Sequence, residues 1–553
     1  MIGYSGYEDW NLAGWRTHLP GVADLRQFAS GLGDETIPAL AAAAADRAPD
    51  RIAVTVDGEP VTHAELDAAA GRVAAWLAGR VHVGDRVLLA AGSSLGFVRC
   101  YLGALRAGAV VVLANPAYTA AELGHLAADS GAVLAFADRE PARLLAGLRP
   151  LGVLGSGRLG VLGRLGAGSA PPLIVDVADQ PDGASRARGA TGATGSGPGA
   201  GGMPRAQDIA LLAYTSGTTG TPKGVPLTHR QLAASITSAM AAWRWSGDDV
   251  LVHALPLYHQ HGLGGLHAAL IAGGTVHIRS KFTAADLAQT IDDTRASALF
   301  AVPTIYQALM NAEVPAGRLR ALRLAVCGSA PLNPALAERL PRLLGRLPLV
   351  RYGTTESGLN VSNPLDDPRG DTIGVPLPGV LARIRATDPQ ADPGANGAAE
   401  LGADGEIQLR GPQVFAGYWQ DPVATEAAFT TDGWFRTGDI GAVDPLTGHL
   451  MIRGRTKEMI ITGGLNVYPR EVEIALEAHA SVSEAAVAGL LDDRWGEQVT
   501  AWVVLKDGHR LDEAGLIAHA HTVLAGYKCP KRVFELAALP RNHLGKIIRS
   551  ALI

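Results

Sequence analysis

The sequence is poor in cysteine and in charge, and each shortage excludes a class of protein. Its 553 residues include three cysteines, Cys100, Cys327 and Cys529, which lie too far apart for a disulfide framework or a metal-binding cysteine motif. This usage favours a reduced, cytoplasmic compartment. Charged residues make up 18% and apolar residues 47%, a balance that excludes a largely disordered chain. The net charge of −5 gives no reason to expect nucleic acid or an anionic membrane as partner.

Long apolar runs are also missing. The best one, residues 103–114, is interrupted by Arg106 and is too short to cross a bilayer. The N-terminal residues lack the basic start and apolar run of a secretory signal. We therefore expect no membrane segment, and the length predicts roughly three to four folding units.

Lysine is scarce among the basic residues. It occurs seven times, and the other 41 of the 48 basic residues are arginine. Where arginine is the default, a lysine is expected at positions that need a compact ammonium on a flexible stem. Lys223, Lys457 and Lys546 all lie within the motifs described below, which makes them candidates for functional positions.

Short β-branched runs alternate with Ala-rich helical patterns along most of the chain. This alternation predicts parallel sheets covered by helices. The expected strands are at 51–56, 85–92, 109–114, 132–137, 250–254, 275–278, 298–302 and 323–328. The segment 179–205 is rich in Gly, Ala and Ser without periodicity, so we expect a mobile and dispensable surface loop there.

The pattern changes twice towards the C-terminus. Short strands and turns over residues 371–454 predict a β-rich subdomain. A helix near 470–479, two strands and a helix near 512–524 then predict a separate small α/β unit. The sequence thus predicts an α/β protein with a large N-terminal domain over 1–454 and a mobile C-terminal domain over 455–553.

The segment 214–225, YTSGTTGTPKGV, combines six hydroxyl side chains with three glycines and one lysine. Glycine lets backbone N–H groups approach a phosphate closely, and hydroxyl groups add further donors. The spacing does not match a Walker A loop. We interpret the segment as a phosphate-binding loop.

Together with four other motifs, this loop resembles the adenylate-forming superfamily of acyl-CoA synthetases, peptide-synthetase adenylation domains and firefly luciferase. The motifs occur in the superfamily's order and are TSGTTGTPKG (215–224), YGTTE (352–356), TGD (437–439), GRTKE (454–458) and PRNHLGK (540–546). A further likeness to malonyl- and methylmalonyl-CoA synthetases rests on segments 243–263, 327–332, 355–364, 414–419 and 461–473. The resemblance implies that a carboxylate attacks the α-phosphate of Mg-ATP, and that CoA then displaces AMP from the acyl-adenylate.

The resemblance also implies a role for individual residues in nucleotide binding. Thr355 would donate to the α-phosphate, Glu356 would hold Mg²⁺, and Asp439 with Arg455 would hold the ribose. The β- and γ-phosphates would lie on Thr215, Ser216, Gly217, Thr218, Thr219, Gly220 and Lys223. The adenine would stack on Tyr352, in a slot formed with Gly328, Ser329, Ala330, Gly353 and Thr354.

Lys546, Thr355 and Glu356 are the expected catalytic residues. The lysine would bridge the substrate carboxylate and the α-phosphate, and Lys457 would be the hinge about which the C-terminal domain turns. Gly463 and Gly464 would line the thiol channel, and a basic patch for the CoA phosphates would be formed by Lys528, Lys531 and Arg532.

The acyl pocket is expected to contain His259, His261, Ala308, Leu359 and Asn360. In the malonyl-CoA synthetases an arginine that holds the distal carboxylate stands where this sequence has Ala308. We therefore expect malonate not to be the preferred acid, because a second carboxylate in a dry pocket needs a cation. Two alternatives stay open: another cation, from Arg279, Lys281 or Arg295, could substitute, or His261 could act when protonated.

Other readings of the whole chain also stay open. The acceptor could be a separate acyl carrier protein, or an amine or nitrite-type nucleophile, in place of CoA. A non-catalytic nucleotide-binding relative is disfavoured, because Thr355, Glu356, Asp439 and Lys546 are all present.

Overall fold

The computed structural model describes Trp15 and residues 18–19, 24–147, 173–177, 203–215, 222–315, 317–386, 402–462, 465–492, 495–542 and 545–553. Nearly all of the predicted loop 179–205 lies outside these ranges, as do residues 216–221 of the predicted phosphate-binding loop and both Gly463 and Gly464. Within the described residues, no helix is both long enough and apolar enough to cross a membrane.

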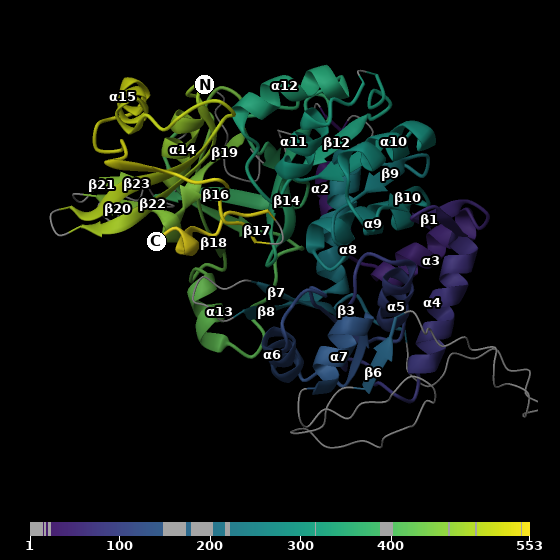
Figure 1. Ribbon diagram of the computed structural model, residues 1–553. Helices are drawn as coiled ribbons and strands as arrows, with labels where there is room; N and C mark the ends of the chain where they lie inside the picture. The colour runs from purple at the N-terminus through teal and green to yellow at the C-terminus, as the bar shows by residue number, and fades with distance from the viewer. Residues whose placement is uncertain are drawn as a thin grey trace, which may run out of the picture.

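Among the described residues there are four sheets, and the six-stranded one is formed by strands between residues 86 and 228 (Figure 1). Its strand order is β6-β5-β3-β4-β7-β8, parallel except for β8. The strands are β3 (Arg86–Ala90), β4 (Val110–Leu113), β5 (Leu134–Ala137), β6 (Leu173–Asp176), β7 (Ile209–Thr215) and β8 (Lys223–Thr228). The helices of this region are α5 (Leu95–Arg106), α6 (Ala120–Ser130) and α7 (Arg139–Gly147).

The largest sheet has nine strands in the order β15-β14-β13-β12-β11-β9-β10-β1-β2, with a parallel centre and antiparallel edges. The strands are β1 (Ile52–Val56), β2 (Glu59–Thr62), β9 (Val250–His253), β10 (Thr275–Ile278), β11 (Ala298–Ala301), β12 (Leu324–Cys327), β13 (Leu349–Thr354), β14 (Gly358–Ser362) and β15 (Val375–Pro376). The helices are α2 (Leu25–Ser30), α3 (Ile37–Arg47), α4 (His63–Leu77), α8 (His229–Ala242), α9 (Gln260–Ala272), α10 (Ala284–Thr294), α11 (Pro303–Asn311) and α12 (Pro334–Leu344). The expected strand–helix alternation is confirmed.

The residues after 380 form two smaller sheets. The antiparallel one has the order β16-β17-β18-β19 and consists of β16 (Leu381–Ala386), β17 (Gly405–Arg410), β18 (Phe435–Val443) and β19 (Leu450–Arg455), with α13 (Pro422–Ala428) between strands. The last sheet contains β20 (Ile460–Thr462), β21 (Leu465–Val467), β22 (Val482–Asp492), β23 (Gly496–Leu505) and β24 (Arg532–Glu535). Its helices are η1 (Thr456–Glu458), α14 (Pro469–Glu477), α15 (Glu513–Val523) and η2 (Arg549–Ala551).

The C-terminal sheet has an apolar core of its own. Residues such as Val472, Leu476 and Val503 are fully buried among other residues from 460 onward. Figure 1 shows this yellow-green unit on one flank of the molecule, beside the strands β16–β18. The carboxyl ends of the parallel strands β11 and β12 and the end of β13 are the places from which the site residues come.

Candidate active site

One side-chain hydrogen bond and one strand pairing bring the YGTTE, TGD and GRTKE motifs together. Tyr352, near the end of β13, donates a 2.6 Å hydrogen bond to Oδ2 of Asp439 in β18. Asp439 is the cross-strand partner of Arg455 in β19, and its Oδ1 lies 2.8 Å from the guanidinium Nε. Burial and the neighbouring carboxylate raise the pKa of Tyr352 well above its usual value, so the phenol stays protonated. The carboxylate of Asp439 is thus held from two sides.

The turn of the TGD motif orients Asp439 locally. Gly438 has φ +70°, in the left-handed region that glycine adopts most easily. The hydroxyl of Thr437 accepts a hydrogen bond from the backbone N–H of Asp439 (3.0 Å) and donates one to the carbonyl of Ile407 (2.7 Å). Only 3% of Asp439 is exposed, so its two contacts lie in a largely dry environment.

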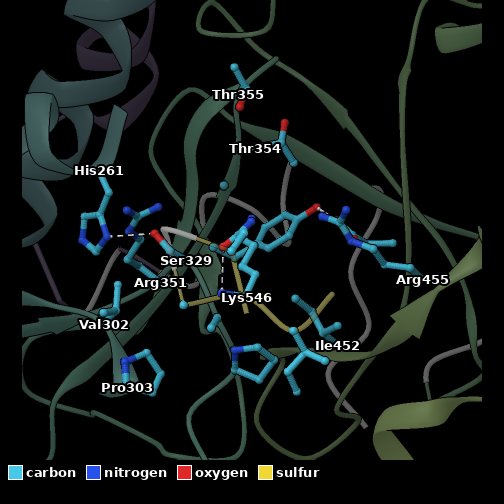
Figure 2. A pocket seen from close by; sticks show the side chains of 18 of the residues that line it. His261, Val302, Pro303, Ser329, Arg351, Thr354, Thr355, Ile452, Arg455 and Lys546 are labelled. Carbon is cyan, nitrogen blue, oxygen red and sulfur yellow. Dashed lines mark hydrogen bonds and ion pairs between the residues drawn. The ribbon is translucent and has the colours of Figure 1, made fainter. Parts of the chain in front are cut away.

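Lys546 reaches the same site from the C-terminal end of the chain. A tight turn presents it: its backbone N–H bonds to Oδ1 of Asn542, and Gly545 before it has φ +76°. Burial, and then the positive charge of Arg455, lower the pKa of Lys546 below its usual value. Figure 2 shows the lysine with Ser329 on one side and Arg455 on the other.

Glu356 is linked through Tyr418 to Lys223 of the predicted phosphate-binding loop. Its Oε1 accepts a 2.9 Å hydrogen bond from Tyr418, and Nζ of Lys223 is 5.0 Å from the centre of the same tyrosine ring. Tyr418 therefore connects the lysine of the phosphate-binding loop to the expected metal ligand. The VFAGYW segment that contains Tyr418 carries part of the family likeness, but nothing in its local pattern indicates where the tyrosine ring points.

The carboxylate of Glu356 is a hard oxygen ligand of the type that Mg²⁺ prefers. Mg²⁺ usually takes one or two carboxylates and completes its shell with phosphates and water. No group of three or more His, Cys, Asp or Glu that could hold a metal occurs in the described ranges. The residues present therefore fit a metal that arrives with its phosphate ligands.

The residues predicted for the acyl pocket come from α9, α11 and β14. His259, His261, Ala308 and Leu359 line the cavity, as do Ser329 and Ala330 after β12. His261 Nδ1 lies 3.0 Å from the Ser329 hydroxyl. Burial and the charge of Arg351 keep the pKa of His261 well below its usual value. The imidazole is therefore neutral at pH 7, and the idea that protonated His261 replaces the missing cation is not supported.

Several expected site residues lie elsewhere. Asn360 is fully buried behind β14, where its amide donates to Ser357 and Gly358 and does not line the cavity. Gly328 packs its backbone against Arg351, which lines the cavity in its place. The substitute cations Arg279, Lys281 and Arg295 are also absent from its lining, and Arg279 is paired with Asp286.

The basic patch proposed for the CoA phosphates is largely neutralised by ion pairs. Lys528 contacts Glu471 at 2.6 Å and Arg532 contacts Glu513 at 3.1 Å. Lys531 donates to the carbonyl of Gly526. None of the three lines the cavity. Lys457, the expected hinge, does line it, in the short helix η1.

One cavity of about 2180 Å³ is lined by Tyr352, Glu356, Asp439, Arg455 and Lys546. Pockets for a single small molecule are usually about 300–1,000 Å³, so this cavity has room for two substrates side by side. Its walls come from both the residues before β19 and the C-terminal unit, including α14 and the tail around Lys546. The fold and the site define an α/β protein with one large cavity between a large N-terminal part and a small C-terminal part.

The chain belongs to the family of AMP-binding enzymes. The family's main model matches residues 41–419, and the model of the AMP-binding enzyme C-terminal domain matches residues 471–546. The resemblance to the adenylate-forming superfamily is therefore confirmed.

Individual relatives agree with this family. The mitochondrial malonate–CoA ligase ACSF3 of Mus musculus is 38% identical over 374 residues, covering 62% of this chain and 64% of the relative. This chain thus matches a little under two thirds of that protein's length. A feruloyl-CoA synthase of Amycolatopsis is 36% identical over 511 residues, covering 91% and 95% of the two chains. The crystal structure of ATP-bound MatB from Rhodopseudomonas palustris has a TM-score of 0.79 at 34% identity, covering 94% and 98%.

Proposed function

We propose that the protein is an acid–CoA ligase, which activates a carboxylic acid with ATP and transfers the acyl group to CoA. The observation that carries this proposal is the meeting of Tyr352, Asp439, Arg455 and Lys546 in one cavity. Membership of the AMP-binding enzyme family and the likeness to named CoA ligases support the same reaction. Because cysteine is scarce and unpaired, we place the reaction in the cytoplasm.

In the first step a carboxylate oxygen of the acid attacks the α-phosphorus of ATP. A bond from oxygen to phosphorus forms, the bond to the β-phosphate oxygen breaks, and pyrophosphate leaves with the electron pair. Negative charge concentrates on the α-phosphate oxygens during this exchange, and positioned cations and donors stabilise it. Lys546 would supply the cation, and Thr355, whose carbonyl is held by Gln260, would supply a donor.

The nucleotide would be held by groups on both sides of Lys546. Asp439 would accept from the ribose hydroxyls, since each carboxylate oxygen has a second lone pair free for them. Tyr352 would stack on the adenine, and the loop 215–224 with Lys223 would hold the outer phosphates. Mg²⁺ on Glu356 would neutralise part of the phosphate charge.

In the second step the thiolate of CoA attacks the acyl carbonyl carbon and AMP leaves. We propose that residues 455–553 turn as a unit about Lys457 between the steps, which exchanges Lys546 for the thiol channel at Gly463 and Gly464. The separate core of the C-terminal unit supports this division. Malonate is not the preferred acid in this proposal, because Ala308 brings no charge to the pocket.

An ATP–pyrophosphate exchange assay with a library of carboxylic acids tests the first step. We expect exchange that depends on the acid, followed by AMP release and thioester formation when CoA is added. Adenylation that CoA cannot discharge, while a carrier protein or an amine can, would contradict the choice of acceptor. Nucleotide binding without exchange for any acid would contradict the enzymatic function itself.

A further inference from the structure

One tyrosine contacts both charged side chains on which Mg-ATP is expected to rest. Tyr418 belongs to the VFAGYW segment, residues 414–419, which lies directly before α13. Its hydroxyl donates to Oε1 of Glu356 at 2.9 Å, and Nζ of Lys223 lies 5.0 Å from the centre of its ring. All three side chains line the cavity. The tyrosine therefore touches a carboxylate through its hydroxyl and an ammonium through its ring.

The backbone of this segment is joined to the same two places. The N–H of Phe415 donates to the carbonyl of Glu356 at 2.7 Å, and the N–H of Trp419 donates to the carbonyl of Gly224 at 2.8 Å. Gly224 directly follows Lys223, and a Cβ there would lie only 2.8 Å from Cβ of Trp419. Glycine at this position permits the close approach. The segment thus bridges the strand β8, where Lys223 lies, and the turn that carries Glu356.

The direction of the tyrosine ring is set by the protein core. Phe415 is 2% exposed and meets the ring of Tyr418 edge-on, with the ring centres 4.9 Å apart. The backbone N–H of Tyr418 donates to the hydroxyl of Thr425 at 2.9 Å, and this hydroxyl donates to the carbonyl of Asp421. The phenol is therefore aimed at Glu356 by contacts that need no ligand.

The tyrosine also lies between two opposite charges. Within the described part of the chain, Lys223 and Glu356 form no ion pair with each other, although both contact Tyr418. A direct pair would neutralise the lysine that the phosphates need and the carboxylate that the metal needs. Burial and the negative charge of Glu356 raise the pKa of Tyr418, so the phenol is a neutral donor at pH 7. Its hydrogen bond occupies one carboxylate oxygen and leaves the other for a further ligand.

We propose that Tyr418 is a positioning residue for Mg-ATP, whose hydroxyl fixes the carboxylate of Glu356 and whose ring keeps Lys223 apart from it. This inference rests on the proposed ligase function. Groups that hydrogen-bond to a metal ligand fix its orientation, and their loss typically lowers metal affinity about 10–100-fold. Tyr418 acts on the nucleotide through these two neighbours, so its effect is confined to a nucleotide with a full triphosphate and its metal.

Nucleotide binding to the full-length protein, measured by calorimetry without any acid, tests the inference. The ligands are ATP with Mg²⁺, ATP with a chelator, and AMP, which lacks the outer phosphates. Tyr418→Phe keeps the ring and removes the hydroxyl, so the Kd for Mg-ATP should rise about tenfold or more while the Kd for AMP is unchanged. Tyr527→Phe removes an exposed phenol that does not line the cavity, and it should change neither Kd.

Several outcomes would overturn the inference. Equal losses for Mg-ATP and AMP in Tyr418→Phe would mean that the phenol serves the fold. An unchanged Kd for Mg-ATP would mean that it does not position the carboxylate. Wild-type protein that binds ATP equally well with and without Mg²⁺ would also overturn it, while acid-dependent pyrophosphate exchange would leave the ligase function intact. No binding of ATP would overturn both.

Two further variants separate the hydroxyl from the ring. Glu356→Gln should lose the same Mg²⁺-dependent affinity as Tyr418→Phe, and the double variant should lose little more, because both changes remove one arrangement. Fully additive losses would overturn the inference. Tyr418→Leu also removes the ring, which lets Lys223 pair with Glu356. It should therefore weaken ATP binding even in the presence of the chelator. A loss confined to Mg-ATP in this variant would show that the ring does not keep the two charges apart.

Discussion

The phenol of Tyr352 donates a hydrogen bond to Asp439, a residue 87 positions further along the chain. The contact joins the expected adenine platform to the expected ribose ligand, and Arg455 holds the other carboxylate oxygen. Tyr352→Phe keeps the ring and removes the donor. Because a hydrogen bond to a charged group contributes about 1.5–3 kcal/mol, we expect the KM for ATP to rise roughly tenfold or more. The KM for the acid should change little, and an unchanged KM for ATP would show that the contact does not organise the nucleotide site.

Lys546→Ala should separate the two half-reactions. Loss of the ammonium leaves the charge on the α-phosphate without its cation, so adenylation should slow by a factor on the order of 10²–10³. Thioester formation from supplied acyl-adenylate should fall much less. The measurement compares pyrophosphate exchange with CoA transfer from the synthetic adenylate, and equal losses would contradict the assigned role.

A hydrogen bond between the N-terminal and C-terminal parts offers a test of the domain orientation. The amide of Asn333 in the large part donates to Oε2 of Glu477 in α14 (2.7 Å), while its Oδ1 caps α12. Asn333→Asp keeps the cap but places two carboxylates together. We expect the free energy that favours this domain orientation to fall by about 1–2 kcal/mol, so that adenylation slows about five- to thirtyfold.

The matched control for this prediction is the double variant Asn333→Asp with Glu477→Gln. It restores one donor and one acceptor at the contact, so adenylation should recover while the cap is unchanged. CoA transfer from supplied adenylate should be little affected in either variant. Failure of the double variant to recover would mean that the loss arises within α12.

Ala308→Arg should move the acid preference towards malonate. The new guanidinium would both fill the space next to α11 and offer a partner for the second carboxylate. We expect kcat/KM for malonate to rise by about tenfold or more relative to butanoate. Ala308→Met, similar in bulk without the charge, should give no such gain. Wild-type enzyme that already prefers malonate tenfold would contradict the substrate prediction.

Buried histidines should make the protein sensitive to mild acid. Burial lowers the pKa of His253 and His229 to about 4 and that of His267 to about 3. As the pH falls below about 6.5, the unfolded chain binds protons that the folded chain does not. The free energy of unfolding should therefore fall with the pH, by up to about 1.4 kcal/mol per pH unit for each histidine, until the folded-state pKa is reached.

Thermal unfolding at pH 7.5, 6.5, 5.5 and 4.5 measures this effect. His253→Gln keeps a donor towards the carbonyl of Gly262, which His253 contacts at 2.9 Å, and removes the titratable ring. The variant should lose less stability between pH 6.5 and 4.5 than the wild type does. An identical pH profile for the two proteins would show that His253 does not resist protonation in the folded state.

The sequence by itself determined the fold class, the order of the motifs and the residue types that the chemistry needs. Alternating strand and helix patterns are local, and so are the glycine turns and the hydroxyl-rich loop, which is why they could be predicted without a structure. The scarcity of lysine made Lys546 a candidate site residue, and the fold places it in the cavity lining.

Only the tertiary structure decided which of these residues meet. Tyr418 and Glu356 are 62 positions apart, and no local pattern connects them. Arg351 is one of 41 arginines in the sequence, and only the fold shows that its Nε has no hydrogen-bond partner among the described residues. Conversely, Lys528 and Arg532 resembled a phosphate site until the fold paired them with Glu471 and Glu513. The reason is that charge compensation depends on distances between remote segments, and these distances are set by packing alone.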